Sequence, residues 1–425
     1  MIDYLKEWVD LSPYIDSPAY EGVRYNPKKI SREKFLVLAP FAVAPSPFYA
    51  DGFYLQGEGD GNHPYHCVGM YYFQEPSAMS AVTALQLQGD ERVLDLCAAP
   101  GSKATAIASR LKAGILVANE IQPSRAKILM ENMERMGISR AVITNNDSEA
   151  IAKALPEYFD KVLVDSPCSG EGMFRKYPRI LGEWSEELVR LCTERSRAVL
   201  ENAAKTLRAG GRLVYSTCTF NLEENEKTIL WFLETHPDFE VVESGLQGGR
   251  AGFLGLDLAR RIFPADGGEG HFVCAMVRKG DLPRRDAPLF KKEKHPEAQA
   301  AFAELLNKVP QGDWICRGNY YYLIDADLPC PAGLRILRAG MQALELKGKQ
   351  WKPMHHMAMC LPKEAFRYGQ ELSVEQARKY LRGETVGCSA QGYGVVCVEG
   401  VPLGWIKTSA GMGKNHYPKG LRTLK

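Results

Sequence analysis

The feature of this sequence that most restricts its fold is a regular alternation of strand-like and helix-like segments between residues 92 and 277. Short apolar, β-branched runs alternate with longer segments of helical periodicity. The predicted strands are residues 92–96, 115–120, 141–144, 161–165 and 212–216, and the predicted helices include residues 123–136, 185–207 and 223–236. Such alternation is typical of βα units, which build a parallel sheet. We therefore predict one α/β domain here.

Composition excludes several other classes of protein. The 53 basic and 51 acidic residues nearly cancel, so the chain is neither a polycation nor a disordered acidic protein. The apolar stretches are too short to cross a bilayer, and residues 1–10 lack the basic and apolar regions of a signal peptide. Eleven cysteines without a repeated spacing argue against a secreted disulfide framework. These observations predict a soluble cytoplasmic protein with reduced thiols.

Charge and proline content predict the domain boundaries. Residues 281–425 carry 22 basic and 14 acidic side chains, whereas residues 1–280 carry 31 and 37. Residues 281–297 are rich in proline and charge and lack apolar periodicity, which is typical of a surface linker. We predict an amino-terminal extension, an α/β domain, a linker and a basic carboxyl-terminal domain, with bounds 1–90, 91–280, 281–297 and 298–425.

Residues that follow the predicted strands indicate a nucleoside-binding site, because open α/β sheets bind ligands beyond the carboxyl ends of their strands. The first strand leads into the small-residue turn CAAPGSK, where backbone N–H groups can approach an anionic ligand. Glu120 ends the second strand, 19 residues after Gly101, where doubly wound sites bind ribose hydroxyls. Asp147 and Asp165 follow the third and fourth strands. Two other readings stay open, because the full GxGxxG fingerprint is absent and Asp147 could simply cap a helix.

Two cysteines lie in corresponding positions after neighbouring strands. Cys168 lies in DSPCSGEGMFRK after the fourth strand, and Cys218 lies in STCTFNLEENE after the fifth. Adjacent strands lie about 4.8 Å apart, so both thiols can face one pocket if these strands are neighbours. The alternative is a pair of ordinary buried thiols. No metal is predicted, because the pair lacks a CxxC partner and the histidines His63, His66, His355 and His356 have no recognised spacing.

These motifs together resemble the Nol/Nop/Sun family of S-adenosylmethionine-dependent RNA cytosine-5 methyltransferases. The resemblance rests on LDLCAAPGSK, ANE, NND, DSPCSGEGMFRK and STCT, and the downstream half is similar to the bacterial ribosomal small-subunit branch. Residues 22–31 are similar to the family's amino-terminal basic element, and residues 411–422 resemble the end of that branch's RNA-binding domain. The resemblance implies a class I, Rossmann-like methyltransferase with RNA-binding extensions at both ends. With two such extensions around the catalytic domain, we expect a monomer.

The resemblance also implies a role for each motif. A thiolate must add to carbon 6 of cytosine before carbon 5 can attack a methyl group, and the family gives this role to Cys218. Cys168 would assist release, and Asp165 with Lys103 would stabilise charge at N3 of the ring. The cofactor-binding residues would be Cys97, Ala98, Ala99, Pro100, Gly101, Ser102, Lys103, Glu120, Asp147 and Asp165. The implied substrate is 16S ribosomal RNA or the small ribosomal subunit.

Basic residues outside the α/β domain are candidates for RNA contacts. The final segment combines cations with two rings, which suits phosphate attraction and stacking. These residues are Lys407, Lys414, Lys419, Arg422 and Lys425 with His416 and Tyr417. A second contact is expected from Arg24, Tyr25, Lys28 and Lys29.

Three alternatives remain open from the sequence. The same reaction could act on transfer RNA. An exocyclic-amine methyltransferase would use DSPC in place of an Asp-Pro-Pro-aromatic motif to hold the amino group, and the Cys218 thiol would then be dispensable. A non-catalytic RNA-binding or assembly protein would keep the fold without turnover, although every side chain that the chemistry needs is present.

Overall fold

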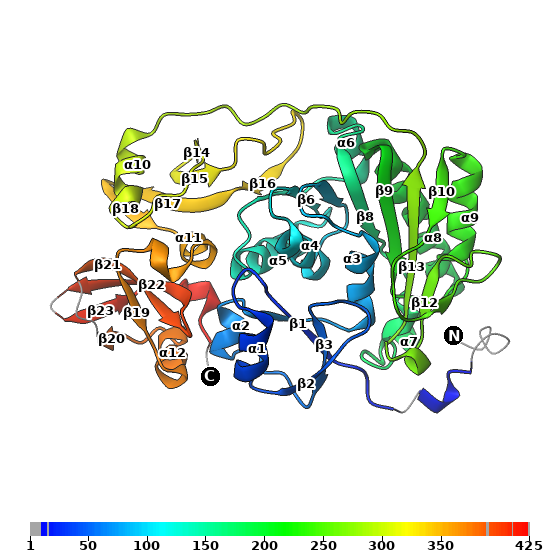
Figure 1. Cartoon of the computed structure of the whole chain (residues 1–425), viewed down its shortest axis with the longest axis horizontal. Helices are drawn as coiled ribbons and strands as arrows, with labels where there is room; N and C mark the ends of the chain where they lie inside the picture. Colours follow the sequence, from blue (N-terminus) through cyan, green and yellow to red (C-terminus); the bar gives the residue numbers. More distant parts are fainter. Residues whose placement is uncertain (1–9, 15–16, 388–390, 410, 424–425) are drawn as a thin grey trace.

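The fold is built around a ten-stranded mixed sheet in the middle of the molecule (Figure 1). The computed structural model describes residues 10–14, 17–387, 391–409 and 411–423. The strands of this sheet are β5 (Arg92–Asp95), β6 (Ile115–Asn119), β7 (Ala141–Thr144), β8 (Phe159–Asp165), β9 (Leu207–Thr217), β10 (Phe239–Val242), β11 (Arg250–Ala251), β12 (Arg260–Ile262), β13 (His271–Arg278) and β16 (Ile336–Ala339). Their order is β11-β12-β13-β9-β8-β5-β6-β7-β16, and β10 also pairs with β13.

The centre of this sheet is parallel, as the sequence predicts. β5 lies between β6 and β8, and the β5–β6, β5–β8, β6–β7 and β8–β9 pairs are all parallel. β13 and β16 run antiparallel to their neighbours β9 and β7. The prediction of an α/β, Rossmann-like fold is therefore confirmed.

Helices cover both faces of the sheet. They are α3 (Ser80–Ala84), α4 (Ser102–Arg110), α5 (Pro123–Arg135), α6 (Ser148–Ala154), α7 (Ile180–Glu183), α8 (Glu186–Thr206) and α9 (Glu226–Thr235). On one face, Leu200 of α8 and Phe232 of α9 share an apolar cluster with Val162 of β8. On the other face, Ile107 of α4 shares a second cluster with Leu163. Successive residues of β8 thus enter opposite cores, which explains the continuous apolar runs of the central strands.

The amino-terminal extension forms a small antiparallel sheet of its own. Its strands β1 (Gly22–Tyr25), β2 (Ala42–Pro45), β3 (Gly52–Gln56) and β4 (Tyr71–Phe73) have the order β2-β3-β1-β4, and α1 (Arg32–Leu38) and α2 (Pro64–Cys67) accompany them. Phe35 and Phe53 from this extension share an apolar cluster with Tyr380 and Ile406 from the carboxyl-terminal part. The amino-terminal extension therefore packs against the carboxyl-terminal part, and Figure 1 shows α1 and α2 beside α12.

The expected RNA contact at residues 24–29 is corrected by the structure. Arg24 is only 1% exposed and donates hydrogen bonds to Ser102 O (2.8 Å) and to Gln74 Oε1 (3.0 Å). Tyr25 is buried in the apolar cluster of the extension. The ammonium groups of Lys28 and Lys29 donate to main-chain carbonyls of other segments. Arg24, Tyr25 and Lys29 therefore fasten the extension to the rest of the molecule, whereas Lys28 is also exposed and stays a predicted RNA contact.

The carboxyl-terminal part contains two further sheets. A four-stranded sheet has the order β14-β15-β17-β18, and its strands are β14 (Asp313–Arg317), β15 (Tyr320–Ile324), β17 (Met341–Lys347) and β18 (Gln350–Pro353). A five-stranded sheet has the order β19-β21-β22-β23-β20, with β19 (Gly369–Glu371), β20 (Val386–Gly387), β21 (Gly392–Val398), β22 (Val401–Ser409) and β23 (Met412–Asn415). The helices of this part are α10 (Pro296–Ala303), α11 (His355–Cys360) and α12 (Val374–Leu381).

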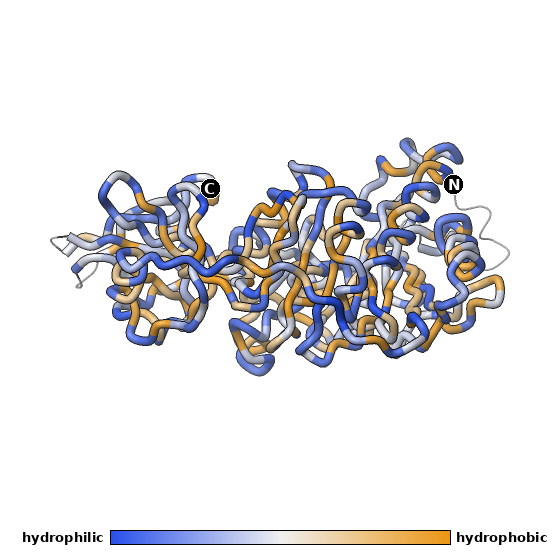
Figure 2. The backbone as a smooth tube through the Cα atoms, turned by 90° about the horizontal axis from the view of Figure 1, so that it is seen from above, coloured by the Kyte–Doolittle hydropathy of each residue, from blue (hydrophilic) through white to orange (hydrophobic). Residues whose placement is uncertain are grey.

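One strand from this later part of the chain joins the central sheet. β16 pairs antiparallel with β7, so that Ala339 lies opposite Val142. The residues between β13 and α10 form an extended segment that connects the α/β domain to the carboxyl-terminal part, which Figures 1 and 2 show from two directions. Arg284 in this segment holds Asp160 of β8 through a 2.8 Å contact between Nε and Oδ1. The α/β domain and the carboxyl-terminal part therefore share a sheet as well as a linker.

Hydrophobic and hydrophilic stretches are both found in every part of the molecule (Figure 2). Within the described residues, no helix combines the length and the apolar character that crossing a membrane requires.

Candidate active site

The two cysteines singled out in the sequence lie side by side. β8 and β9 are adjacent and parallel, with Asp165 opposite Ser216 in the register. The loops that follow these strands therefore leave the same edge of the sheet together. Cys168 Sγ lies 3.3 Å from Cys218 Sγ, and both side chains are partly exposed. The two sulfur atoms are therefore in contact at one edge of the sheet.

The two thiols are electrostatically unequal. The hydrogen bond to Cys218, together with burial, raises the pKa of Cys168 well above its ordinary value. Cys168 therefore holds its proton and can donate it to the sulfur of Cys218. The Lys103 ammonium lies close enough to Cys218 for the two groups to interact electrostatically. Cys218 therefore has the proton of Cys168 on one side and the Lys103 cation nearby.

Lys103 and Asp165 form an ion pair beside the thiols. Lys103 Nζ lies 2.7 Å from Asp165 Oδ2, and Ser216 Oγ donates to Asp165 Oδ1 at 2.8 Å. Burial alone would lower the pKa of Lys103, but the Asp165 carboxylate raises it. Burial alone would raise the pKa of Asp165, but Lys103 lowers it. The site therefore holds a fixed ammonium and a fixed carboxylate. The Asp165 side chain is 30% exposed and the Lys103 side chain 7%, so the carboxylate is the more accessible of the two.

Two buried groups near this pair were missed as site residues. Asp95 ends β5 and is fully buried, and burial followed by the nearby Asp165 charge raises its pKa to about 8. His271 begins β13 and is 2% exposed, and burial with the nearby Lys103 charge lowers its pKa to about 3. Both side chains are therefore neutral at pH 7. The strand-end rule points to Asp95, but it cannot find His271, which starts an antiparallel strand.

A cavity of about 500 Å³ opens beside the first two strand ends. Glu120 is 2% exposed, and its Oε1 accepts the Gln122 backbone N–H at 2.9 Å. Arg125 lies on the opposite side of this carboxylate, 3.5 Å from Oε2, and also donates to Ala99 O at 2.8 Å. The cavity is lined by Leu96, Cys97, Asn119, Glu120, Ile121, Gln122, Arg125, Asn146, Asp147, Ser148, Pro167, Arg195, Ala198 and Val199.

Three of the predicted cofactor residues, Cys97, Glu120 and Asp147, line this cavity. Asp147 also caps α6, because its Oδ1 accepts the Ala150 backbone N–H at 2.7 Å, so both readings of this residue hold. Gly101 in the turn has a φ of +108° and contacts α5 so closely that an added Cβ would lie 3.2 Å from Leu129. A larger residue would strain the turn that separates the cavity from the thiols.

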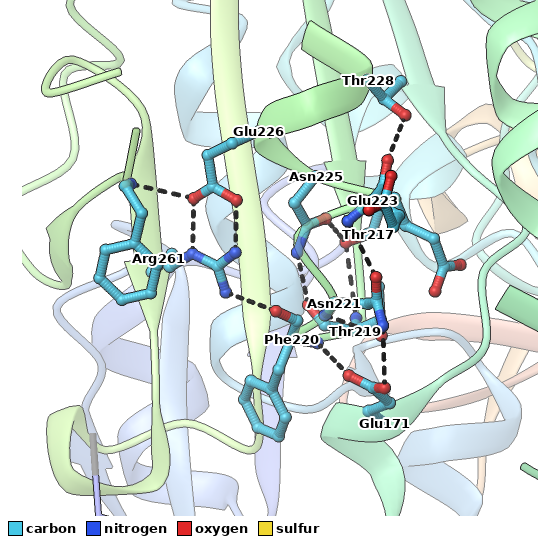
Figure 3. A network of polar contacts seen from close by, with 12 residues as sticks. Glu171, Thr217, Thr219, Phe220, Asn221, Glu223, Asn225, Glu226, Thr228 and Arg261 are labelled. Carbon is cyan, nitrogen blue, oxygen red and sulfur yellow. Dashed lines mark hydrogen bonds and ion pairs between the residues drawn. The ribbon is translucent and has the colours of Figure 1, made fainter. Parts of the chain in front are cut away.

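A polar network holds the loop that carries Cys218 (Figure 3). Arg261 is bound by both carboxylate oxygens of Glu226, and its Nη1 donates to Phe220 O at 2.8 Å. Glu171 Oε2 accepts the Phe220 backbone N–H at 3.2 Å, and Asn225 Nδ2 donates to Thr219 O at 2.9 Å. The backbone immediately after the thiol is therefore fixed from three sides.

Removing one partner of the buried ion pair should destabilise the protein strongly. Arg261 and Glu226 are 1% and 0% exposed, so Glu226→Ala leaves a buried guanidinium without its counter-charge. We expect the free energy of unfolding to fall by about 3 to 5 kcal/mol, measured by urea denaturation. Glu194→Ala, which removes a solvent-exposed contact to Arg190, is the matched control and should change the midpoint far less. Equal effects of the two substitutions would contradict this account.

A parallel α/β sheet with a cavity beside its first strand ends is typical of Rossmann-like, nucleoside-binding folds. Residues 82–277 match the family model for 16S rRNA methyltransferase RsmB/F. Residues 3–76 match the N-terminal domain of 16S rRNA methyltransferase RsmF, and residues 370–423 match the methyltransferase RsmF PUA domain.

Relatives match over almost the whole chain. A protein of Klebsiella pneumoniae named ribosomal RNA small subunit methyltransferase F is 36% identical over 95% of this chain and 90% of its own length. A protein of the same name from Shigella boydii is 35% identical over the same shares. The crystal structure of a methyltransferase homolog from Pyrococcus horikoshii is 29% identical, with a TM-score of 0.56 over 64% of this chain and 90% of that one. The chain belongs to the RsmB/F methyltransferase family.

Proposed function

We propose that this protein transfers a methyl group from S-adenosylmethionine to carbon 5 of a cytosine in 16S ribosomal RNA, through a covalent bond between Cys218 and the base. The observation that carries the proposal is the pair of thiols 3.3 Å apart beside the Lys103–Asp165 ion pair. Methylation of an exocyclic amine needs no nucleophilic thiol and leaves this pair without a role. The relatives named for the small ribosomal subunit favour 16S over transfer RNA.

The cavity fits S-adenosylmethionine in size and chemistry. Its volume of about 500 Å³ lies within the usual range for cofactor pockets. The buried Glu120 carboxylate can accept hydrogen bonds from ribose hydroxyls, and Asp147 is placed to bind the adenine end. Apolar side chains such as Ile121 and Val199 provide a surface for the ring. When bound, this cofactor supplies an electrophilic methyl group.

The chain's own residues would carry the rest of the reaction. The Cys218 thiolate forms a bond to carbon 6 of cytosine, and the electrons of the C5–C6 double bond shift toward N3. Protonated Lys103 can stabilise the developing charge there, whereas ionised Asp165 can accept a hydrogen bond from the base's amino group. Carbon 5 of the enamine-like ring would then bond to the methyl group, and the bond between that methyl group and the cofactor's sulfonium sulfur would break with its electrons left on the sulfur.

Release requires a base for the proton on carbon 5. Once Cys218 carries the ring, its sulfur no longer bears the charge that kept the proton on Cys168. Cys168 can then lose that proton to solvent and, as a thiolate, accept the carbon 5 proton. The C6–sulfur bond breaks as the double bond reforms, and its electrons return to Cys218.

The five-stranded sheet supports an RNA-binding face. Lys407 and Lys414 are exposed and lie directly opposite each other on β22 and β23. Like charges in this position repel each other, so an anionic partner would stabilise the pair. Lys407 also lies 4.8 Å from the centre of the Tyr393 ring.

The other predicted contacts at this end of the chain differ in exposure. Lys419 is exposed, Arg422 and His416 are half-buried, and Lys425 lies outside the described residues. Tyr417 is 5% exposed and packs edge-on against Tyr380, so it belongs to the core and is corrected as a stacking platform.

Reversing the charge at Lys407 and Lys414 should weaken RNA binding. We expect Lys407→Glu with Lys414→Glu to lower affinity for a 16S RNA fragment on the order of tenfold at physiological salt, because two phosphate contacts are lost. The slope of log K against log salt concentration should fall by about 1.5. The control, Lys205→Glu with Lys279→Glu, changes net charge equally at exposed positions of the α/β domain. An unchanged slope in the test variant, or an equal loss in the control, would argue against this face.

Bisulfite mapping of ribosomal and transfer RNA tests the whole proposal in cells. Small-subunit RNA from cells with the protein should contain a protected cytosine that is absent when the gene is deleted. Protection that is lost only from transfer RNA would overturn the substrate. Identical maps would overturn the reaction.

A further inference from the structure

A buried carboxylate connects the two cysteine loops to each other. Ser169 directly follows Cys168, and Thr219 directly follows Cys218. Glu224 Oε1 accepts the Ser169 backbone N–H at 2.8 Å, and Oε2 accepts the Ser169 hydroxyl at 2.6 Å. The hydroxyls of Ser169 and Thr219 lie 2.8 Å apart. With Ser169 donating to the carboxylate, Thr219 donates to Ser169, and one chain of hydrogen bonds joins both loops.

Burying the Glu224 carboxylate at this position costs free energy. It is 0% exposed, and among the described residues no lysine or arginine forms an ion pair with it. Burying a carboxylate without a counter-charge is unfavourable unless its oxygens are hydrogen-bonded, and both oxygens are used on Ser169. The Tyr215 hydroxyl donates to Glu224 O at 2.7 Å and fixes its backbone. The side chain is therefore rigidly placed, and what it holds is the loop of Cys168.

We propose that Glu224 is a positioning residue that keeps Cys168 in register with Cys218 during release of the methylated base, an inference that rests on the proposed function. The Cys218 loop has other supports, because Arg261, Glu171 and Asn225 hold its backbone. In the Cys168 loop, Ser196 Oγ donates to Pro167 O at 3.3 Å before the thiol, and Ser169 directly after the thiol donates twice to Glu224. Loss of Glu224 therefore displaces Cys168 more than Cys218, and release suffers more than attack.

Substitutions at Glu224 separate positioning from proton transfer. Glutamine can accept the Ser169 N–H with its oxygen and donate to the Ser169 hydroxyl with its nitrogen, so it keeps the connection without the charge. Alanine removes the connection. A positioning role predicts that Glu224→Gln stays within about tenfold of the unaltered turnover. Glu224→Ala should lower turnover on the order of 100-fold, the effect of misplacing a reacting group by about 1 Å, with KM changed less than about threefold.

The experiment compares covalent RNA adducts on denaturing gels for the full-length protein and its variants, with a 16S RNA fragment and S-adenosylmethionine. Cys168→Ala is the reference, because it should accumulate adduct if Cys168 serves release. Glu224→Ala should accumulate adduct in the same way, Ser169→Ala to a smaller extent, and Glu224→Gln little. Thr206→Val removes a buried hydroxyl that donates to Ala203 O within α8, and this variant should behave like the unaltered protein.

The possible failures point to different errors. If Cys168→Ala accumulates no adduct, the proposed function falls, and this inference falls with it. If Cys168→Ala accumulates adduct while Glu224→Ala and Ser169→Ala release RNA normally, only the inference is overturned. Glu224→Gln as inactive as Glu224→Ala would also overturn it, because the charge rather than the connection would then matter. Should Glu224→Ala fail to fold, Ser169→Ala decides by the same criterion.

Discussion

Replacing Cys218 with alanine is expected to lower methyl transfer to 16S RNA by about 10⁴-fold or more, because the substitution removes the nucleophile itself. Without a bond to carbon 6, carbon 5 of cytosine stays a poor nucleophile. The Cys218 side chain is partly exposed, and the backbone around it is held by Arg261 and Asn225, so the fold should persist. Transfer of labelled methyl groups to an RNA fragment measures the loss, and the affinity for S-adenosylmethionine should stay unchanged.

The matched control is Cys316→Ala, which removes another partly exposed thiol from β14, in a different sheet. It should leave methyl transfer intact. If Cys218→Ala kept most of its activity, the thiol would have no role in bond formation. The exocyclic-amine reaction would then replace the cytosine-5 reaction as the explanation of this site.

Replacing Cys168 with alanine should block release instead of attack, so that a stable covalent complex with RNA accumulates. The Cys218 sulfur can still attack carbon 6, because the substitution leaves Cys218 and Lys103 in place. The proton on carbon 5 then lacks its acceptor, and the ring stays bonded to the enzyme. Most of the variant should migrate as an RNA adduct on a denaturing gel, whereas the unaltered protein shows little.

The control for this result is the double variant Cys168→Ala with Cys218→Ala. It should form no adduct, because nothing remains to bond carbon 6. An adduct in the double variant would mean that a different nucleophile reacts. A Cys168→Ala enzyme that turned over normally would remove Cys168 from the release step.

The sequence predicts the central sheet well because both faces of its parallel strands are buried. The middle of β8 is the unbroken apolar run VLV in KVLVD, because Val162 and Leu163 enter opposite cores. The sequence predicts that the two thiols lie together only if the fourth and fifth strands are neighbours, and the structure supplies that adjacency by pairing β8 with β9. Local pattern and long-range geometry agree at this site.

Other features depend on contacts that no local pattern contains. β16 joins the central sheet beside β7 from almost 200 residues further along the chain. The pattern of its four residues does not predict that it pairs with β7. Arg24 and Lys29 look like a solvent-facing basic cluster, yet both bond main-chain oxygens of distant segments. Glu224 lies at the start of the predicted helix 223–236, although the observed helix begins at Glu226, and the contacts of Glu224 depend on Ser169 in another loop. The sequence does not show whether a charged side chain forms hydrogen bonds with water or with a buried carbonyl group.

The most direct test of the account is peptide mass spectrometry of the Cys168→Ala protein, quenched during reaction with 16S RNA and S-adenosylmethionine and then digested with protease and nuclease. The account predicts a methylated cytosine nucleotide bonded to the peptide that contains Cys218. A nucleotide on another residue, or an unmodified Cys218 peptide alongside methylated RNA, would contradict it.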